Sequence, residues 1–140
     1  MDVLYTAEAT AWGGREGRAK TSDGHVDVQM VIPKEMGGPG GEGTNPEQLF
    51  ATGYAACFHS ALKLVAGREK ISVEGSAITA RVGIGPNDSG GFGLAVTLVG
   101  EFPGVPADQA RALLEAAHQV CPYSNATRGN IDVQLELYDE

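Results

Sequence analysis

The chain has 140 residues, the size of one domain that buries about two-thirds of its unfolded surface and folds without disulfides or metals. Its 10 basic and 18 acidic side chains give a net charge of −8, which argues against nucleic acid or an anionic membrane as a partner. The first ten residues lack the basic and apolar regions of a signal peptide, and no apolar run approaches the roughly 20 residues of a membrane span. We therefore expect one cytoplasmic domain over residues 1–140.

Three short strands are expected before residue 33. Residues 3–12 have a strand-like composition, the GGREG segment supplies a turn, and a second run ends at the hairpin signal Ser22-Asp23-Gly24. In residues 25–32 apolar and polar side chains alternate, as in a strand with one buried face. The three runs together predict a meander.

A glycine-rich segment, PKEMGGPGGEGT, leads into the first predicted helix and is a candidate lid. The helix begins with Asn45 as its N-cap, Pro46 at the first helical position and Gln48 at the position of a capping box. We expect it to end near Gly67.

A second hairpin, a second helix and a last strand complete the expected order. Alternating apolar residues at 78–84 and 94–98, separated by PNDSGG, predict the hairpin. Residues 106–120 read as an amphipathic helix, and residues 131–137 alternate cleanly as a strand. The order βββ-α-ββ-α-β is that of an α+β domain.

Cys57 and Cys121 are the only two cysteines. In a reducing cytosol, such a pair is more often catalytic or metal-binding than structural. Cys57 has apolar neighbours in the first helix, where burial raises the pKa of a thiol and makes it inert unless a cation lies beside it. Cys121 follows the second helix, whose negative dipole end disfavours a thiolate and suits a second, resolving thiol. Considered alone, each is more often a packing residue.

Arg15 and Glu47 are the polar candidates near these cysteines. A small-residue turn lets the Arg15 guanidinium reach inward, whereas a turn arginine is otherwise usually solvated. Glu47 lies in the first helical turn, where a carboxylate also simply suits the helix dipole. The three histidines show no metal-ligand spacing with the cysteines, so we expect no metal site. They are His25, His59 and His118.

Four segments closely resemble the organic hydroperoxide resistance (Ohr) family of the Ohr/OsmC superfamily: GGREG, GGPGGEGTNPEQLFATGYAACF, GGFGL and VCPYSNATRGNIDV. The resemblance covers essentially the whole chain, and CPYSNATRGN resembles the Ohr branch rather than the OsmC branch. It implies the Ohr/OsmC-like fold, an intertwined homodimer with central helices, and a thiol-dependent peroxidase that reduces organic hydroperoxides to alcohols.

The resemblance also implies roles for four residues, none of them substituted here. Cys57 matches the peroxidatic cysteine, Cys121 the resolving cysteine, Arg15 the arginine that activates the thiolate, and Glu47 the carboxylate that orients that arginine. The implied cycle passes through a Cys57 sulfenic acid and a Cys57–Cys121 disulfide. Lipoyl groups carried on other proteins, or another dithiol, then reduce the disulfide. No cofactor is required, because the redox centre is protein sulfur.

The spacing of Glu47 and Cys57 constrains how such a site is built. Ten residues of unbroken helix separate two side chains by about 15 Å along the axis and roughly 80° around it. One arginine head group could hardly contact both. Either the helix breaks, for example at Gly53, or another subunit donates Arg15 and Glu47 to Cys57. Because the helix is apolar on most of its circumference, we expect an obligate homodimer with two composite sites.

Met36, Phe50 and Phe92 are expected to line a pocket that favours bulky apolar hydroperoxides, such as fatty-acid or cumene-like species, over hydrogen peroxide. Two other functions remain open. One is a non-catalytic redox sensor in which the disulfide changes a binding surface, although the sequence has no basic helix or recognition module. The other is a hydrolase or acyl-transfer enzyme with Cys57 as nucleophile, although no histidine is well placed as its base.

Overall fold

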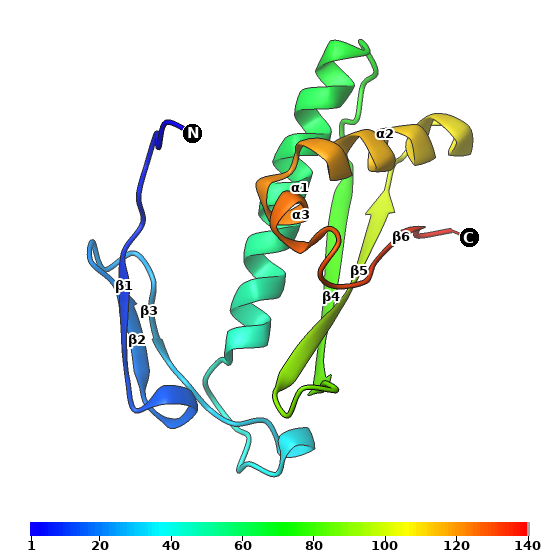
Figure 1. Cartoon of the computed structure of the whole chain (residues 1–140). Coiled ribbons are helices and arrows are strands. Elements are labelled where there is room, and N and C mark those ends of the chain that lie inside the picture. The colour runs from blue at the N-terminus through cyan, green and yellow to red at the C-terminus, as the bar shows by residue number, and fades with distance from the viewer. Residues whose placement is uncertain (140) are drawn as a thin grey trace. The chain divides into compact units, whose positions relative to one another are not determined.

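A computed structural model describes residues 1–139 as parts of two compact units, Met1–Leu49 and Phe50–Glu140, here called unit 1 and unit 2 (Figure 1). The combination of helices with two small sheets makes this an α+β protein, as the sequence predicts. In unit 1 the elements are β1 (Ala9–Trp12), η1 (Gly14–Glu16), β2 (Arg18–Thr21), β3 (Asp27–Gln29) and η2 (Lys34–Met36), where η marks a 3₁₀-helix. The single domain expected over residues 1–140 stays a prediction.

The remaining elements begin with α1 (Pro46–Arg68), whose first turn belongs to unit 1 and whose other turns belong to unit 2. Those that follow are β4 (Ala77–Pro86), β5 (Phe92–Glu101), α2 (Ala107–Val120), α3 (Pro122–Thr127) and β6 (Val133–Leu137).

The sheet of unit 1 is the predicted meander, with antiparallel order β1-β2-β3. Its outer strands are shorter than expected: β1 begins at Ala9 and β3 ends at Gln29. β3 ends there because the Val31 N–H donates to the carbonyl of Thr44, in the glycine-rich segment, instead of continuing the ladder. The role of that segment as a lid stays a prediction.

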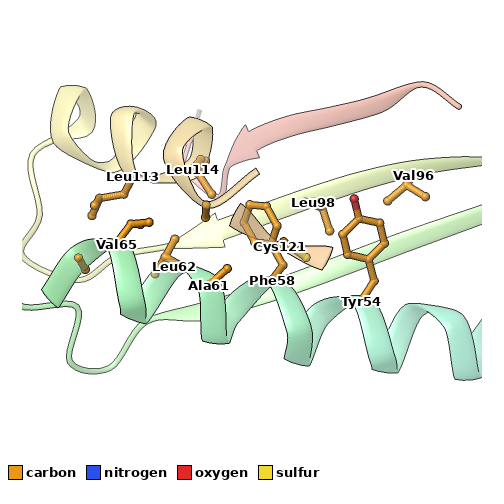
Figure 2. Packing of buried hydrophobic residues seen from close by; sticks show 12 residues of the cluster. Tyr54, Phe58, Ala61, Leu62, Val65, Val96, Leu98, Leu113, Leu114 and Cys121 are labelled. Atoms are coloured by element: carbon orange, nitrogen blue, oxygen red, sulfur yellow. The ribbon is translucent and has the colours of Figure 1, made fainter. Parts of the chain in front are cut away.

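The sheet of unit 2 has the order β4-β5-β6. β4 and β5 form the predicted hairpin, with Ala77 opposite Glu101 and Pro86 opposite Phe92. The chain then crosses over through α2 and α3, so that β6 pairs parallel with β5. This crossover brings the residues around Cys121 back to α1, as Figure 2 shows.

One face of α1 forms the core of unit 2 with the sheet and α2 (Figure 2). Tyr54, Phe58 and Leu62 recur every four residues along the helix, so they lie on the same face, and each is fully buried. Leu98 of β5 and Leu114 of α2 close over them. Cys121 lies inside this core rather than on a loop surface.

The start and length of α1 agree with the sequence prediction. The Asn45 side-chain oxygen accepts a hydrogen bond of 2.8 Å from the Gln48 N–H, as an N-cap does. The helix then runs without interruption through Gly53 to Arg68. The suggested helix break at Gly53 is therefore wrong.

At 23 residues, α1 is also long and apolar enough to cross a membrane when judged by length and composition alone. The expectation that no apolar run reaches such a length was wrong. The core helix of a soluble protein passes the same test, and α1 buries one face in the core of unit 2. Packing in this core accounts for the apolar residues on the buried face of α1.

Directly after Cys121 the chain forms α3, an element that is absent from the order predicted from the sequence. Pro122 occupies its first position, which suits a residue without an N–H. Six residues are too few to display helical periodicity, which explains why the pattern did not reveal it. Cys121 therefore joins two helices, as C-cap of α2 and N-cap of α3.

Candidate active site

Cys57 and Cys121 lie side by side in unit 2, although 64 residues separate them in sequence. Their sulfur atoms are 3.4 Å apart, with the Cys121 thiol donating toward the Cys57 sulfur, and both thiols are free. A disulfide bond length is about 2.05 Å, so a small approach of the two sulfurs would join them. Cys121 is fully buried, whereas Cys57 is half-buried. Cys57 is therefore the sulfur that an external reagent can reach.

Burial raises the pKa of the Cys57 thiol. The backbone N–H of Tyr123 works in the opposite direction, and the neighbouring Cys121 sulfur adds a smaller upward effect. The environment within unit 2 thus favours the neutral thiol over the thiolate. Nucleophilic chemistry at Cys57 requires a positive charge beside it.

Arg15 and Glu47 form a two-pronged ion pair in unit 1. The distances are 2.8 Å from Nη1 to Oε2 and 2.6 Å from Nη2 to Oε1. These hydrogen bonds lower the pKa of Glu47 and raise the pKa of Arg15, so both groups are charged at neutral pH. A bidentate arrangement fixes the plane of the guanidinium as well as its charge. The Glu47 side chain is 13% exposed, and the Arg15 side chain is 33% exposed.

The backbone that presents Arg15 depends on its glycines. Gly13 and Gly14 have φ values of +78° and +57°, a region that other L residues rarely adopt. At Gly17, a Cβ atom would overlap the carbonyl oxygen of Trp12. The GGREG sequence therefore encodes one tight turn, with Arg15 in its 3₁₀-helix.

The structure brings the four predicted residues together as two pairs. Cys57 and Cys121 form one pair in unit 2, and Arg15 and Glu47 form the other in unit 1.

A pocket of about 700 Å³ lies in unit 2 between the α1–α3 region and the β4–β5 hairpin. Phe50 and Phe92, both predicted to bind substrate, line it together with Tyr123. Met36, which lies in η2 of unit 1 and is 42% exposed, is not among the residues that line this pocket. The assignment of Met36 to a substrate pocket stays a prediction.

Tyr123 connects this pocket to the reactive sulfur. Its ring lies 6.0 Å from Phe50 and 5.7 Å from Tyr54, centre to centre. It also packs over Gly53, where a Cβ atom would come within 3.0 Å of the Tyr123 hydroxyl. The same residue lines the pocket, and its backbone N–H acts to lower the pKa of the Cys57 thiol.

A set of buried polar side chains near the cysteines was not found from the sequence. Tyr54, Ser124, Thr127 and His118 hydrogen-bond to one another. Ser124 and Thr127 are three residues apart on α3, so they share a face, but a six-residue helix gave no periodic signal. Within residues 1–139, no group of three or more His, Cys, Asp or Glu side chains could hold a metal ion.

The family model of OsmC-like proteins matches residues 38–136. The chain belongs to this family. This OsmC-like chain is 57% identical over 136 residues to the organic hydroperoxide resistance protein of Xanthomonas axonopodis pv. citri (strain 306), covering 96% of this chain and 95% of the relative. It is 48% identical over 136 residues to the organic hydroperoxide resistance protein OhrB of Bacillus subtilis (strain 168), covering 96% and 98%.

A solved structure shows the same fold. The crystal structure of an organic hydroperoxide resistance protein from Elizabethkingia anophelis has a TM-score of 0.93 and 52% sequence identity to this OsmC-like chain. The match covers 98% of both chains. The resemblance read from the sequence motifs is thus confirmed at the level of family and fold.

Proposed function

We propose that this protein is a thiol-dependent peroxidase that reduces organic hydroperoxides to alcohols. The observation that carries the proposal is the 3.4 Å separation of the Cys57 and Cys121 sulfurs, because it suits a thiol that is oxidised first and a second thiol that traps it. The names of the relatives, which are organic hydroperoxide resistance proteins, point to the same substrate class.

In the first step, the Cys57 thiolate attacks the distal oxygen of the hydroperoxide. The O–O bond breaks, the sulfur becomes a sulfenic acid, and the alkoxide leaves and takes up a proton to become the alcohol. Arg15 would stabilise the thiolate and then hydrogen-bond the oxygen on which negative charge develops. Glu47 would hold the guanidinium fork in place, in the bidentate arrangement that the pair has in unit 1.

In the second step, the Cys121 sulfur attacks the Cys57 sulfenic acid. A Cys57–Cys121 disulfide forms, and the sulfenic oxygen leaves as water with the Cys121 proton. An external dithiol then reduces the disulfide and is itself oxidised to a disulfide. Because Cys121 is fully buried and Cys57 is not, the attack of the reductant falls on the Cys57 sulfur. We propose a lipoyl group on a partner protein as this dithiol and the cytoplasm as the location.

Bulky apolar hydroperoxides, of the fatty-acid or cumene type, are the proposed substrates. The pocket beside Tyr123 supports this preference, because Phe50, Phe92 and Leu94 contribute to its lining. An apolar tail gains free energy by leaving water for such a surface, whereas hydrogen peroxide has no tail to bury.

An obligate homodimer with two composite sites is proposed as the active form. The uninterrupted course of α1 supports it, because ten residues of helix extend about 15 Å. The spacing of Glu47 and Cys57 left two alternatives, a break in α1 or donation of Arg15 and Glu47 by a second chain. Because α1 is unbroken, donation by a second chain remains. The apolar side chains that α1 leaves exposed, such as Leu64 at 48%, would be covered by the partner.

Rapid mixing of the reduced protein with cumene hydroperoxide tests the proposed reaction. We expect both thiols to disappear with one equivalent of hydroperoxide, and sustained turnover when dihydrolipoamide is present. Hydrogen peroxide at the same concentration should react far more slowly.

Two single-cysteine variants serve as controls. Cys57→Ser should abolish the reaction, whereas Cys121→Ser should react once and accumulate sulfenic acid, detectable as a dimedone adduct. Retention of full peroxidase turnover by Cys57→Ser would refute the proposal, and equal rates with hydrogen peroxide would refute the substrate preference.

A further inference from the structure

A buried hydrogen-bonded chain of four side chains joins α1, α2 and α3 around the two cysteines. His118 Nδ1 lies 2.8 Å from Ser124 Oγ, and Ser124 Oγ lies 2.8 Å from the Tyr54 hydroxyl. The Tyr54 hydroxyl lies 3.0 Å from Thr127 Oγ1, which in turn donates to the carbonyl of Ser124 at 3.2 Å. Tyr54, Ser124 and Thr127 are buried, and His118 is half-buried.

Once Thr127 donates to the carbonyl of Ser124, counting protons gives the direction of every other hydrogen bond in this chain. Each hydroxyl has one proton. Thr127 uses its proton on the Ser124 carbonyl, so Tyr54 must donate to Thr127. Tyr54 has then no proton left, so Ser124 donates to Tyr54.

The same count fixes the tautomer of the histidine. With the Ser124 proton used on Tyr54, His118 must donate to Ser124 through an Nδ1–H. The chain therefore runs from His118 to Ser124, Tyr54 and Thr127 and closes on the backbone of Ser124. Every hydroxyl proton in it has one acceptor.

Three residues of this hydrogen-bonded chain each lie three positions from a cysteine. Tyr54 precedes Cys57 by three residues on α1, so the two lie about one turn apart. His118 precedes Cys121 by three residues and Ser124 follows it by three, on the two helices that Cys121 joins. The hydrogen bonds thus fasten the backbone on both sides of Cys121 to the α1 turn that precedes Cys57.

A second contact secures the same corner from outside. The Arg128 guanidinium donates to the backbone carbonyl of His118 at 2.9 Å and also contacts the Asn125 side chain. It holds the end of α3 against the end of α2, where Cys121 lies. It does not join α1. The Tyr54 hydrogen bonds do, and they add to the packing of Tyr123 on α1 and to the contact between the two sulfurs.

We propose that Tyr54, Ser124 and His118 are positioning residues for disulfide formation, which hold the Cys121 sulfur against the Cys57 sulfur. None of them contacts the reacting sulfurs through a hydrogen bond in the structure. They act by keeping the α2–α3 corner at a fixed distance from α1, which maintains a high effective concentration of one sulfur at the other. The proposed peroxidase function gives this disulfide its biological role, but its formation can be measured without any peroxide.

The test is the equilibrium of the Cys57–Cys121 disulfide with glutathione. In this exchange the two protein thiols give two electrons and two protons to oxidised glutathione, which yields the protein disulfide and two reduced glutathione molecules. Tyr54→Phe removes one buried hydroxyl and retains the ring, so it is the first variant. We expect its effective thiol concentration to fall by about tenfold relative to the parent.

Two further variants probe the direction of the chain. His118→Leu removes the donor to Ser124 and should lower the effective concentration as Tyr54→Phe does. His118→Asn retains an N–H near the position of Nδ1 and should restore most of the parent value. A role in stability alone would not separate these two variants by their thiol equilibrium when both are folded at the temperature of the assay.

Ser76→Ala is the matched control. Ser76 pairs with His59 Nε2 at 2.9 Å, so this change also removes one serine–histidine hydrogen bond from unit 2. Its glutathione equilibrium should match that of the parent. An unchanged equilibrium in Tyr54→Phe, or a shift of that variant toward the disulfide, would overturn the proposal.

Reaction with cumene hydroperoxide separates this inference from the proposed function. Tyr54→Phe should lose its first thiol at the rate of the parent, form the disulfide about tenfold more slowly, and yield more dimedone adduct. If the parent does not react with the hydroperoxide, and Tyr54→Phe still has a lower effective thiol concentration than the parent, the peroxidase function is wrong and the positioning role stands.

Discussion

Cys57 and Arg15 need each other in the proposed chemistry. Burial raises the pKa of the Cys57 thiol, so the thiol is mostly protonated at neutral pH in the environment of unit 2. Arginine provides a positive charge that does not titrate in this range and a planar head group that Glu47 holds at two points. At the scale of single residues, the carboxylate determines where that charge points.

Arg15→Lys should impair the first step even though it preserves the charge. A lysine ammonium cannot form the two parallel hydrogen bonds with Glu47, so its position is less fixed. We expect the rate of Cys57 oxidation by cumene hydroperoxide to fall by about 10- to 100-fold. Stopped-flow measurements would show this, and the pH profile of Cys57 alkylation should move to higher pH. Parent-like kinetics in this variant would contradict the role assigned to the fork.

Glu47 should make the free energy of unfolding decrease as the pH becomes acidic. Its pKa is lowered by the Arg15 hydrogen bonds, so the folded protein binds this proton less tightly than the unfolded chain does. The stabilisation is fully present above the usual glutamate pKa of about 4.3 and is lost as the pH falls through the lowered value. Urea unfolding between about pH 7 and pH 3 should therefore show a smaller loss of stability for Glu47→Gln than for the parent.

Glu16→Gln provides the comparison for that experiment. Glu16 belongs to the same turn as Arg15 and is exposed. Because Glu16→Gln leaves the Arg15–Glu47 pair intact, this variant should keep the larger loss of stability in acid that the parent shows. If the two glutamine variants respond alike to acid, the Arg15–Glu47 pair does not contribute the pH dependence.

At the scale of elements, short irregular segments decide where the reactive groups lie. The η1 turn presents Arg15, and the corner between α2 and α3 presents Cys121. Both depend on local backbone chemistry rather than on a periodic pattern. The regular elements that carry them provide rigid supports.

Gly17→Ala should disrupt the turn that presents Arg15. Its Cβ would overlap the backbone carbonyl oxygen of Trp12, which cannot rotate away as a side chain would. We expect a loss of about 3 kcal/mol in the free energy of unfolding, measured with urea. Gly14→Ala is the control: its Cβ would meet no atom within 4 Å, so only its positive φ opposes the change, at about 1 kcal/mol. Equal losses in the two variants would contradict this account.

Regular elements were predicted well from the sequence, and short ones were not. The N-cap at Asn45 and the hairpin of β4 and β5 follow from residue types that act locally, so their positions could be read directly. α3 has too few residues for a period, and β1 is shorter than its composition suggested. The Tyr54–Ser124 hydrogen bond joins residues 70 positions apart and gave no local signal.

At the scale of the whole molecule, several apolar side chains have no cover within the chain. All four residues of β1 are exposed, including Trp12 at 58%, and Leu64 of α1 is 48% exposed. A partner chain that covers them is consistent with the proposed homodimer.

Mixing two inactive variants should restore activity if the sites are composite. In a mixed dimer of Arg15→Ala and Cys57→Ser chains, one site would combine Cys57 of the first chain with Arg15 of the second. We expect such mixtures, refolded together, to regain about a quarter of the parent activity, because half of the dimers are mixed and each has one intact site. Cross-linking or light scattering should show a dimer for the parent.

A mixture of Arg15→Ala and Glu47→Ala chains is the matched negative control. Both residues would be donated by the same chain, so neither site of that mixed dimer would be complete. Failure of the first mixture to gain activity over its separate components, or a fully active monomer, would disprove the composite site.

The sequence by itself determined the family, the α+β class, the start of the central helix and the identity of the two cysteines. These depend on residue type and near-neighbour spacing, which are present in the chain before it folds. Only the tertiary structure decided that the Cys57 and Cys121 sulfurs lie 3.4 Å apart, that α1 passes Gly53 unbroken, and that a directed hydrogen-bond chain connects their helices. Those features arise from packing between distant segments, which no local pattern encodes.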